Sequence, residues 1–423
     1  MTNDPERSRV ELERALGATP AYEAWRPLDP GPGHGVDARY AALPATTTAA
    51  MRAATAAAFA PRDSDLAGAL ARGEAELVRT SGTTGSPVTL VWSQAWWDAS
   101  ERSSFALNTH LARVATGSHR EAVLASPRCV GPGIDGGPRD ARARTLGRLL
   151  FLNEEPDVAR WSDAAVRRMG AELERYAPAV LEADPYYLAA LCARAAALGV
   201  ELARPELLVF TYARPSRLHL ARIARALPVP IASSFGSTET GYVLVSCEQG
   251  RLHQNVASCR VDLAPLPASA RAPDLCRLRV TPFGHPFMCL LRFDPGDLVR
   301  PSTAACPCGR SAGLVCDDVV GRVSDATLGA DGRLVPLAEL DAALASAASA
   351  EAIVSYQLEQ QRGGALRLRT TADAALDAPA LARSLRALYG ARAAITVESV
   401  AALVPEPSGK YLAVRHGTAA GLG

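Results

Sequence analysis

Periodic hydrophobic positions divide the first two thirds of the chain into strands and helices. Two short strands are predicted at residues 75–79 and 87–92, with a polar loop between them. Helical periodicity follows at about 94–114 and returns at 162–176 and 185–198. This order of elements indicates helices packed on a sheet.

Short apolar runs at 206–210 and 230–233 predict buried strands among these helices. Strands that alternate with helices favour an α/β body with ligand sites at the strand ends. The opening 60 residues are expected to be helical segments interrupted by the Pro- and Gly-rich stretch 29–35. The predicted fold class of this large N-terminal part is therefore α/β.

The pattern changes after about residue 321. Two strands are predicted within 353–371, a helix at 379–389 and a further strand at 395–404, which together make a small α+β unit. We therefore predict a large domain at 1–321 and a small C-terminal domain at 322–423.

Composition supports more than one structural unit and excludes several classes of protein. A chain of 423 residues is too long for one ordinary core, and 48% hydrophobic with 21% charged residues is typical of soluble globular proteins. A formal charge of +1 gives no reason to expect a nucleic-acid or anionic-membrane partner. The polar N-terminus and the absence of an 18-residue apolar run favour a cytoplasmic protein.

Lysine usage is the most unusual compositional feature. Lys410 is the single lysine among 45 basic residues, and it lies in Pro407-Ser408-Gly409-Lys410. An ammonium is a compact point charge, whereas a guanidinium is a wide planar fork. We expect Lys410 to occupy a place that an arginine could not fill, although an ordinary surface lysine stays an alternative.

Three further stretches carry candidate chemistry for a nucleotide. Residues 80–87 are rich in hydroxyls, glycines and bare amides, as expected for a phosphate cradle, although a hairpin turn would have the same composition. Residues 235–239 place a ring, a hydroxyl and a carboxylate after a buried strand, suited to adenine, the α-phosphate and Mg²⁺, or simply to a solvated strand end. Asp297 follows a Pro-Gly turn and could accept both ribose hydroxyls.

In order along residues 75 to 415, these stretches resemble the motifs of the adenylate-forming superfamily, and most closely those of its phenylacetate-CoA ligase-like branch. The phosphate loop resembles 81–87, the Tyr-Gly-x-Thr-Glu element resembles 235–239, and the Arg-Tyr-x-x-Gly-Asp element resembles 292–297. Residues 321–325 resemble the hinge segment, and 407–410 the catalytic-lysine motif.

The resemblance implies an adenylate-forming ligase whose small C-terminal domain is a mobile lid. Such an enzyme joins an aryl or arylacetic acid to AMP with release of pyrophosphate, and then transfers the acyl group to a thiol, most simply that of coenzyme A. A carrier-protein thiol, an amine acceptor and a non-catalytic adenylate-binding homologue are the alternatives, and a homodimer is left open. The residues that the resemblance assigns to catalysis are Lys410, Thr238 and Glu239, with Glu239 holding Mg²⁺; to ATP, Ser81, Gly82, Thr83, Thr84, Gly85, Phe235, Gly236, Asp297 and Arg322; and to the hinge, Asp325.

Two departures from the family pattern weaken parts of this assignment. The family often has a lysine where Ser86 stands, so one phosphate-facing charge is missing. Residues 211–215 replace a stretch that usually reads Gly-Gly-Glu-Pro, which puts the adenine pocket in doubt and favours the non-catalytic alternative. The surviving Lys410 argues against that alternative.

Glycine- and tyrosine-containing stretches are candidates for the walls of an acid pocket. Glycines let a flat ring approach the backbone, and tyrosine faces suit aromatic contacts, although each position could equally be ordinary loop or core. The candidate residues are Val130, Ile134, Tyr187, Tyr212 and Tyr242.

Nine cysteines in a chain of this size favour reduced thiols and metal ligation over disulfides. Cys247, His253, Cys306 and Cys308 would supply three thiolates and one imidazole for a closed tetrahedral Zn²⁺ site, and Cys-Pro-Cys-Gly suits a metal knuckle. Four protein ligands leave no open position, so the predicted zinc is structural; inert core cysteines are the alternative.

Overall fold

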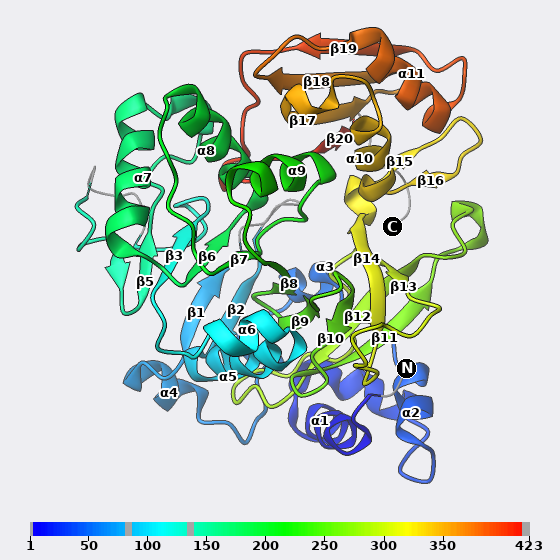
Figure 1. Cartoon of the computed structure of the whole chain (residues 1–423). Helices are drawn as coiled ribbons and strands as arrows, with labels where there is room; N and C mark the ends of the chain where they lie inside the picture. Colours follow the sequence, from blue (N-terminus) through cyan, green and yellow to red (C-terminus); the bar gives the residue numbers. More distant parts are fainter. Residues whose placement is uncertain (1–2, 81–86, 133–138, 417–423) are drawn as a thin grey trace. The chain divides into compact units, whose positions relative to one another are not determined.

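The computed structural model describes residues 3–80, 87–132 and 139–416, and it divides the chain into two compact units (Figure 1). Strand β8 (Ile231–Ser237) begins in the second unit and ends in the first. The first unit comprises Met1–Ala112, Ser234–Leu266 and Asp274–Asp318, and the second comprises Arg113–Ser233, Pro267–Pro273 and Val319–Gly423.

Short helices make up most of the N-terminal part of the first unit. Helix α1 starts with Asp4, whose side chain accepts a hydrogen bond from the backbone N–H of Arg7, and with Pro5 at its first position. Its inner face packs with Tyr22, Tyr40 and Phe293 in one buried cluster. The helices are α1 (Pro5–Ala18), α2 (Val36–Ala42), α3 (Thr48–Ala53), α4 (Leu66–Arg72), α5 (Gln94–Ser104) and α6 (Thr109–Val114), with 3₁₀ helices at Pro20–Leu28, Ala56–Phe59 and Phe105–Leu107.

The predicted helix at 94–114 is wrong as a continuous element, because it is interrupted before Asn108. The side-chain oxygen of Asn108 accepts hydrogen bonds from the backbone N–H groups of His110 and Leu111, which starts α6 as a separate helix. The Asn108 side-chain amide donates to the Ser246 carbonyl. Periodicity alone could not reveal this break, since both halves keep the same hydrophobic spacing.

Antiparallel pairing dominates the sheets of the first unit. The predicted strands around residues 81–86 form a separate hairpin, β1 (Glu76–Arg79) with β2 (Thr89–Trp92). The remaining strands follow the order β11-β12-β13-β14-β10-β9-β8. Their bounds are β9 (Gly241–Ser246), β10 (Leu252–Gln254), β11 (Cys259–Pro265), β12 (Cys276–Pro282), β13 (Asp297–Pro301) and β14 (Val315–Arg322).

Parallel strands form the centre of the second unit, in the order β8-β7-β6-β3-β5-β4. All four residues of β3 and of β7 are buried, as expected for parallel strands covered on both faces. The side chains of Asp184 and Ser216 cap the first turns of α8 and α9. The elements are β3 (Glu121–Leu124), β4 (Thr145–Leu146), β5 (Leu149–Phe151), α7 (Asp163–Tyr176), β6 (Val180–Ala183), α8 (Pro185–Ala197), β7 (Leu207–Phe210) and α9 (Arg217–Ala226).

The C-terminal part of the second unit contains the predicted small α+β arrangement. A four-stranded sheet has the order β19-β18-β17-β20, and its central hairpin turns at Gly363 and Gly364, which both have positive φ. The predicted strand at 395–404 ends earlier, at Ser399. The elements are β15 (Thr327–Leu328), β16 (Leu334–Val335), α10 (Leu337–Ala345), β17 (Ile353–Gln360), β18 (Leu366–Ala372), α11 (Ala378–Tyr389), β19 (Ile395–Ser399) and β20 (Val414–His416).

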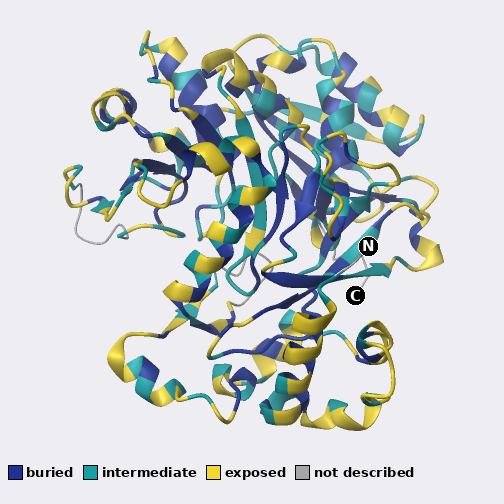
Figure 2. Ribbon diagram, turned by 60° about the horizontal axis from the view of Figure 1, so that its bottom comes forward, coloured by how far each residue is buried: buried dark blue, intermediate teal, exposed yellow. Residues whose placement is uncertain are grey.

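The predicted α/β class with a smaller α+β part is confirmed. Figure 2 shows buried residues along the strands and exposed residues on the outer faces of the helices. The domain boundary at residue 321 stays a prediction, because β14 runs through it. Among the described helices, none combines the length and the apolar character that a membrane crossing requires.

Candidate active site and metal centre

A β-hairpin in the first unit carries most of the predicted nucleotide residues. Phe235 and Gly236 lie on β8, and the pairing with β9 shifts register between them, so that Gly236 faces Tyr242. A side chain at Gly236 would place its Cβ 2.0 Å from the Gly241 carbonyl oxygen, so glycine is required for this close approach. The bulge changes the direction of the strand immediately before its polar end.

The tip of this hairpin presents a hydroxyl and a carboxylate. The Thr240 side chain lies 3.2 Å from the Ser237 backbone nitrogen and 3.0 Å from the Ser237 hydroxyl, which fixes the turn. Thr238 and Glu239, the two predicted catalytic residues in this turn, are both partly exposed. Their oxygens can therefore reach a ligand, and a carboxylate is a suitable ligand for Mg²⁺.

Aromatic side chains from helix α5 lie beside the same hairpin. The Trp97 ring centroid is 5.0 Å from that of Tyr242 and 4.6 Å from that of Trp92. The backbone N–H of Tyr242 donates to the Ser100 hydroxyl at 2.9 Å, which holds β9 against α5. Trp92 and Trp97 were not among the residues predicted from sequence, although a tryptophan at the end of a strand and another in the helix that follows are a detectable signal.

Asp297 is the first residue of β13 and is buried, after the positive-φ residue Gly296. The neighbouring Asp294 fixes this turn, because its carboxylate accepts the Gly296 N–H at 3.0 Å and pairs with Arg277 at 3.1 Å. Arg292 of the same motif is buried and lies within hydrogen-bond distance of the Tyr40 carbonyl. The contact of Asp297 with a ribose stays a prediction.

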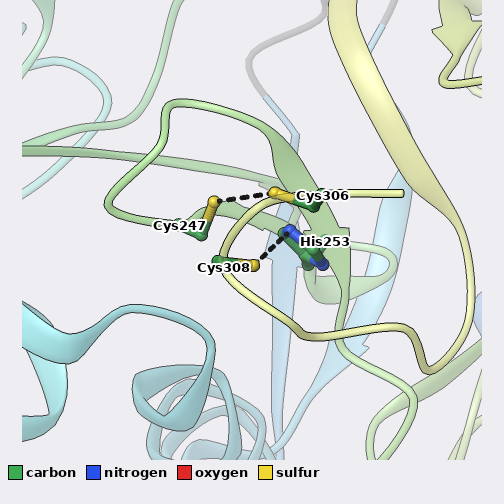
Figure 3. Close-up of side chains that lie close together, drawn as sticks. All are labelled: Cys247, His253, Cys306 and Cys308. Carbon is green, nitrogen blue, oxygen red and sulfur yellow. Dashed lines mark hydrogen bonds between the residues drawn. The ribbon is translucent and has the colours of Figure 1, made fainter. Parts of the chain in front are cut away.

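The four predicted zinc ligands come together in the first unit (Figure 3). Their candidate ligand atoms all lie within 4.8 Å of one another. The Cys247 and Cys306 sulfurs are 3.7 Å apart, and the Cys308 sulfur is 3.4 Å from His253 Nε2. In a tetrahedral zinc site these edges would be about 3.8 Å and about 3.5 Å, from metal–ligand lengths of about 2.3 Å and about 2.0 Å.

Local structure explains how residues 59 positions apart in the sequence meet. Cys247 follows β9, and its N–H donates to the Arg251 carbonyl in a tight turn that leads to His253 on β10. The second pair lies on a turn closed by the Gly309 N–H and the Cys306 carbonyl, at 3.1 Å. Two of the six ligand-to-ligand distances match a tetrahedral zinc site, and three thiols with one imidazole suit zinc, so these are the residues that would hold the predicted metal.

Lys410 lies in the second unit, in a short turn that its own backbone closes. The Glu406 N–H donates to the Lys410 carbonyl, and the Gly409 N–H donates to the Glu406 carbonyl. Burial raises the pKa of the Asp184 carboxyl to about 6, against the opposing charge of Lys410. Burial also raises the pKa of the Cys129 thiol, again opposed by Lys410.

The Cys129 sulfur lies 3.3 Å from the Ser408 carbonyl oxygen, so the Lys410 turn contacts the segment that follows β3. Asp184 directly follows β6, and Ser126 and Cys129 follow β3, so the turn is at the carboxyl ends of two parallel strands. This is the edge of an α/β sheet where ligands generally bind.

Four further predicted site residues lie in the described part of the second unit. Arg322 ends β14, and its charge opposes the rise in the pKa of the Asp325 carboxyl that burial causes. Tyr212 has a positive φ of 69°, and Val130 is partly exposed. Tyr187 is fully buried, with its hydroxyl 2.7 Å from the Gly409 carbonyl oxygen.

Six predicted site residues lie outside the described residues. Five of them belong to the proposed phosphate loop, and one belongs to the proposed acid pocket. They are Ser81, Gly82, Thr83, Thr84, Gly85 and Ile134.

Solved structures that share this fold include CoA ligases. One is 2-hydroxyisobutyryl-CoA ligase in the postadenylation state in complex with R3-HIB-AMP, at a TM-score of 0.70 and 16% identity over 97% of this chain and 88% of that chain. Another solved structure with this fold is ATP-bound MatB from Rhodopseudomonas palustris. Its TM-score is 0.51, with 14% identity over 79% of this chain and 66% of that chain.

A third is the anthranilate CoA ligase AuaEII in complex with anthranoyl-AMP, at a TM-score of 0.50 and 13% identity over 80% of this chain and 65% of that chain. No protein-family model and no curated protein matches the sequence. At these identities the likeness establishes the fold.

Proposed function

We propose that the chain is an ATP-dependent acid–thiol ligase. A substrate carboxylate oxygen attacks the α-phosphorus of ATP, the bond to the bridging oxygen breaks, and pyrophosphate leaves. A thiol then attacks the acyl carbon of the acyl adenylate, AMP leaves, and the thiol proton is released. The observation that carries this proposal is the single ammonium of the chain, held in a closed turn at the carboxyl ends of β3 and β6.

The charges that develop in the first step define the role of each residue. Negative charge grows on the α-phosphate and on its flanking oxygens, so preorganised donors and cations lower the barrier. Lys410 would supply the ammonium, Thr238 a hydroxyl donor, and Glu239 a ligand for Mg²⁺, which neutralises phosphate charge when bound. Phe235, Gly236, Asp297 and Arg322 would complete the nucleotide site together with the loop at 81–85.

An aromatic acid is the proposed substrate. The partly exposed rings of Trp97 and Tyr242 support it, since such faces suit a flat aromatic ring. The solved structures with this fold include ligases named for anthranilate, which is aromatic, and for 2-hydroxyisobutyrate, which is aliphatic. A pyrophosphate-release screen over both kinds of acid distinguishes them, and activity with aliphatic acids alone would contradict an aromatic substrate.

Coenzyme A is the proposed acceptor, with a carrier-protein thiol or an amine as the alternatives. The solved neighbours are CoA ligases, which favours the free cofactor. We further propose that residues from 322 onward rotate about Asp325 between the two half-reactions. AMP formation with coenzyme A, compared with a carrier protein and with amines, tests the acceptor.

The proposed zinc is structural. Cys247, His253, Cys306 and Cys308 form a closed four-ligand set, so the metal would join the β9–β10 turn to the 306–309 turn and take no part in the reaction. Its removal should therefore act through folding stability.

The test of the proposed function is acid-dependent ATP–pyrophosphate exchange by wild type, Lys410→Ala and Lys410→Arg. Wild type should exchange, and Lys410→Ala should lose at least about 100-fold, because a preorganised charge at the reacting phosphate is removed. Lys410→Arg should not restore the rate, since a planar fork does not replace a point charge. Exchange by Lys410→Ala at the wild-type rate refutes the role of Lys410, and no exchange by wild type with any acid favours the non-catalytic alternative.

A further inference from the structure

Three consecutive backbone carbonyls in the Lys410 turn each lie within hydrogen-bond distance of a different side chain of the second unit. The Arg128 guanidinium donates to the Pro407 carbonyl at 2.8 Å, and the Ser126 hydroxyl donates to the Ser408 carbonyl at 2.7 Å. The Tyr187 hydroxyl lies 2.7 Å from the Gly409 carbonyl oxygen and 2.6 Å from the Pro156 carbonyl oxygen, and its single proton is shared between these two acceptors. We name Ser126, Arg128 and Tyr187 the lysine seat.

The residue after Lys410 adds an aromatic contact to the same region. The Tyr411 ring stacks on the Tyr186 ring, with a centroid separation of 3.7 Å and an interplanar angle of 10°. The Tyr411 hydroxyl accepts the Val158 N–H at 2.9 Å and lies 3.3 Å from an Asp157 carboxylate oxygen. The backbone is therefore held on both sides of Lys410.

Gly409 shows that the turn is shaped to this docked position. Its φ is 81°, a conformation that disfavours other residues. A Cβ at this position would lie 2.0 Å from the Ser126 hydroxyl oxygen and 3.0 Å from Pro156 Cβ. The positive φ requires glycine for the turn itself, whereas the short Cβ distances require glycine for contact with the lysine seat.

We propose that Ser126, Arg128 and Tyr187 are positioning residues for adenylation. They act on the reaction through Lys410: by binding the carbonyls that precede it, they fix the point from which its side chain would reach the reacting phosphate. The proposal rests on the proposed function, in which Lys410 serves the first half-reaction. A hydrogen bond that orients a catalytic group is needed because a misplacement of about 1 Å can cost roughly 100-fold in rate.

The lysine seat acts in one half-reaction only. If residues from 322 onward rotate about Asp325, as proposed, all three carbonyl contacts break before the thiol attacks. Weakening the lysine seat therefore slows the adenylation step and leaves the reaction of a preformed acyl adenylate with coenzyme A unchanged. A residue that served only general stability would affect both steps alike.

The experiment compares Tyr187→Phe and Ser126→Ala with Tyr176→Phe in the full-length protein. Tyr176 is a matched control, because its hydroxyl also donates to a backbone carbonyl of the second unit, that of Arg148, at 2.7 Å. Each variant is assayed for ATP–pyrophosphate exchange, for thioester formation from the synthetic acyl adenylate of an acid that supports exchange, and for amide hydrogen exchange in residues 405–413.

Tyr187→Phe should reduce pyrophosphate exchange about tenfold, since the Gly409 and Pro156 carbonyls lose the donor that they share. Ser126→Ala should reduce it several-fold. Thioester formation should change by less than about twofold in Ser126→Ala, which lies outside the candidate acid pocket. Amide exchange in 405–413 should rise in both variants, and Tyr176→Phe should match wild type in all three assays.

Two results overturn the proposal while leaving the proposed function in place. One is wild-type pyrophosphate exchange in both seat variants when Lys410→Ala is inactive. The other is an equal loss in both half-reactions, which indicates a structural role. If wild type shows no exchange with any acid, the proposed function fails, and amide exchange in 405–413 still decides whether the lysine seat holds the turn.

Discussion

Gly409→Ala tests the shape of the Lys410 turn directly. The new methyl group would lie 2.0 Å from the Ser126 hydroxyl oxygen and 2.9 Å from Ser126 Cβ. Both distances are far below van der Waals contact, so the docked turn and the Ser126 side chain cannot both keep their positions.

The magnitude follows from two separate costs. Alanine with a left-handed φ costs about 1 kcal/mol relative to glycine. Displacement of Ser126 removes its bond to the Ser408 carbonyl, worth about 1 kcal/mol, and adds residual overlap of similar size. A total of about 2 to 3 kcal/mol lowers the equilibrium constant for docking of the turn by roughly 30- to 150-fold.

The assay is acid-dependent ATP–pyrophosphate exchange, which should fall by this factor, alongside thioester formation from the acyl adenylate, which should not. Gly364→Ala is the matched control: its φ is 86° and nothing lies within 4 Å of the added Cβ, so only the backbone cost applies. Adding Ser126→Gly to Gly409→Ala removes the overlapping atoms and should recover part of the loss. Exchange within twofold of wild type in Gly409→Ala would refute the reasoning.

Three further predictions concern stability. Purified protein should hold one zinc per chain, and Cys306→Ser should lose the metal and lower Tm by more than about 5 °C. Cys276→Ser, which lies outside the cluster, should keep the metal. Metal-free wild-type protein would contradict the zinc site. Because the Asp184 pKa is raised by burial to about 6, its contribution to stability is present below the unfolded-state pKa and is lost as pH rises through 6. Denaturant titrations should therefore show Asp184→Asn gaining stability relative to wild type between pH 4 and pH 7, and a pH-independent difference contradicts this. The Arg214 guanidinium lies 3.4 Å from the fully buried Asp341 carboxylate, so Arg214→Ala should lower the free energy of unfolding by about 3 kcal/mol, and adding Asp341→Asn should recover part of it; equal losses in the single and double variants would contradict the pairing.

Hydrophobic periodicity was sufficient to predict the fold class and most elements, because helix and strand spacing are local properties of the sequence. It failed where a single polar side chain redirects the backbone: Asn108 divides one predicted helix into two. The end of β19 at Ser399 was also missed, since apolar residues continue beyond it. Neither the break at Asn108 nor the end of β19 is marked by a change in hydrophobic spacing.

The candidate site divides in the same way. Cys306 and Cys308 were predictable together with Cys247 and His253, because thiols and imidazoles reveal their chemistry by residue type. The lysine seat was not predictable, since Ser126 binds a backbone carbonyl 282 residues away, and any residue at that position would present the same carbonyl. Only the folded chain identifies such a contact.

The sole ε-amino group of this chain is in the Lys410 turn, where the side chain is partly exposed. Amine-directed chemistry is thereby limited to one side chain without any engineering of the sequence. A fluorophore, crosslinker or isotopic methyl group attached through that amine would report on a single side chain, and its protection by ATP and substrate acid could be followed by mass measurement of the peptide that contains Lys410.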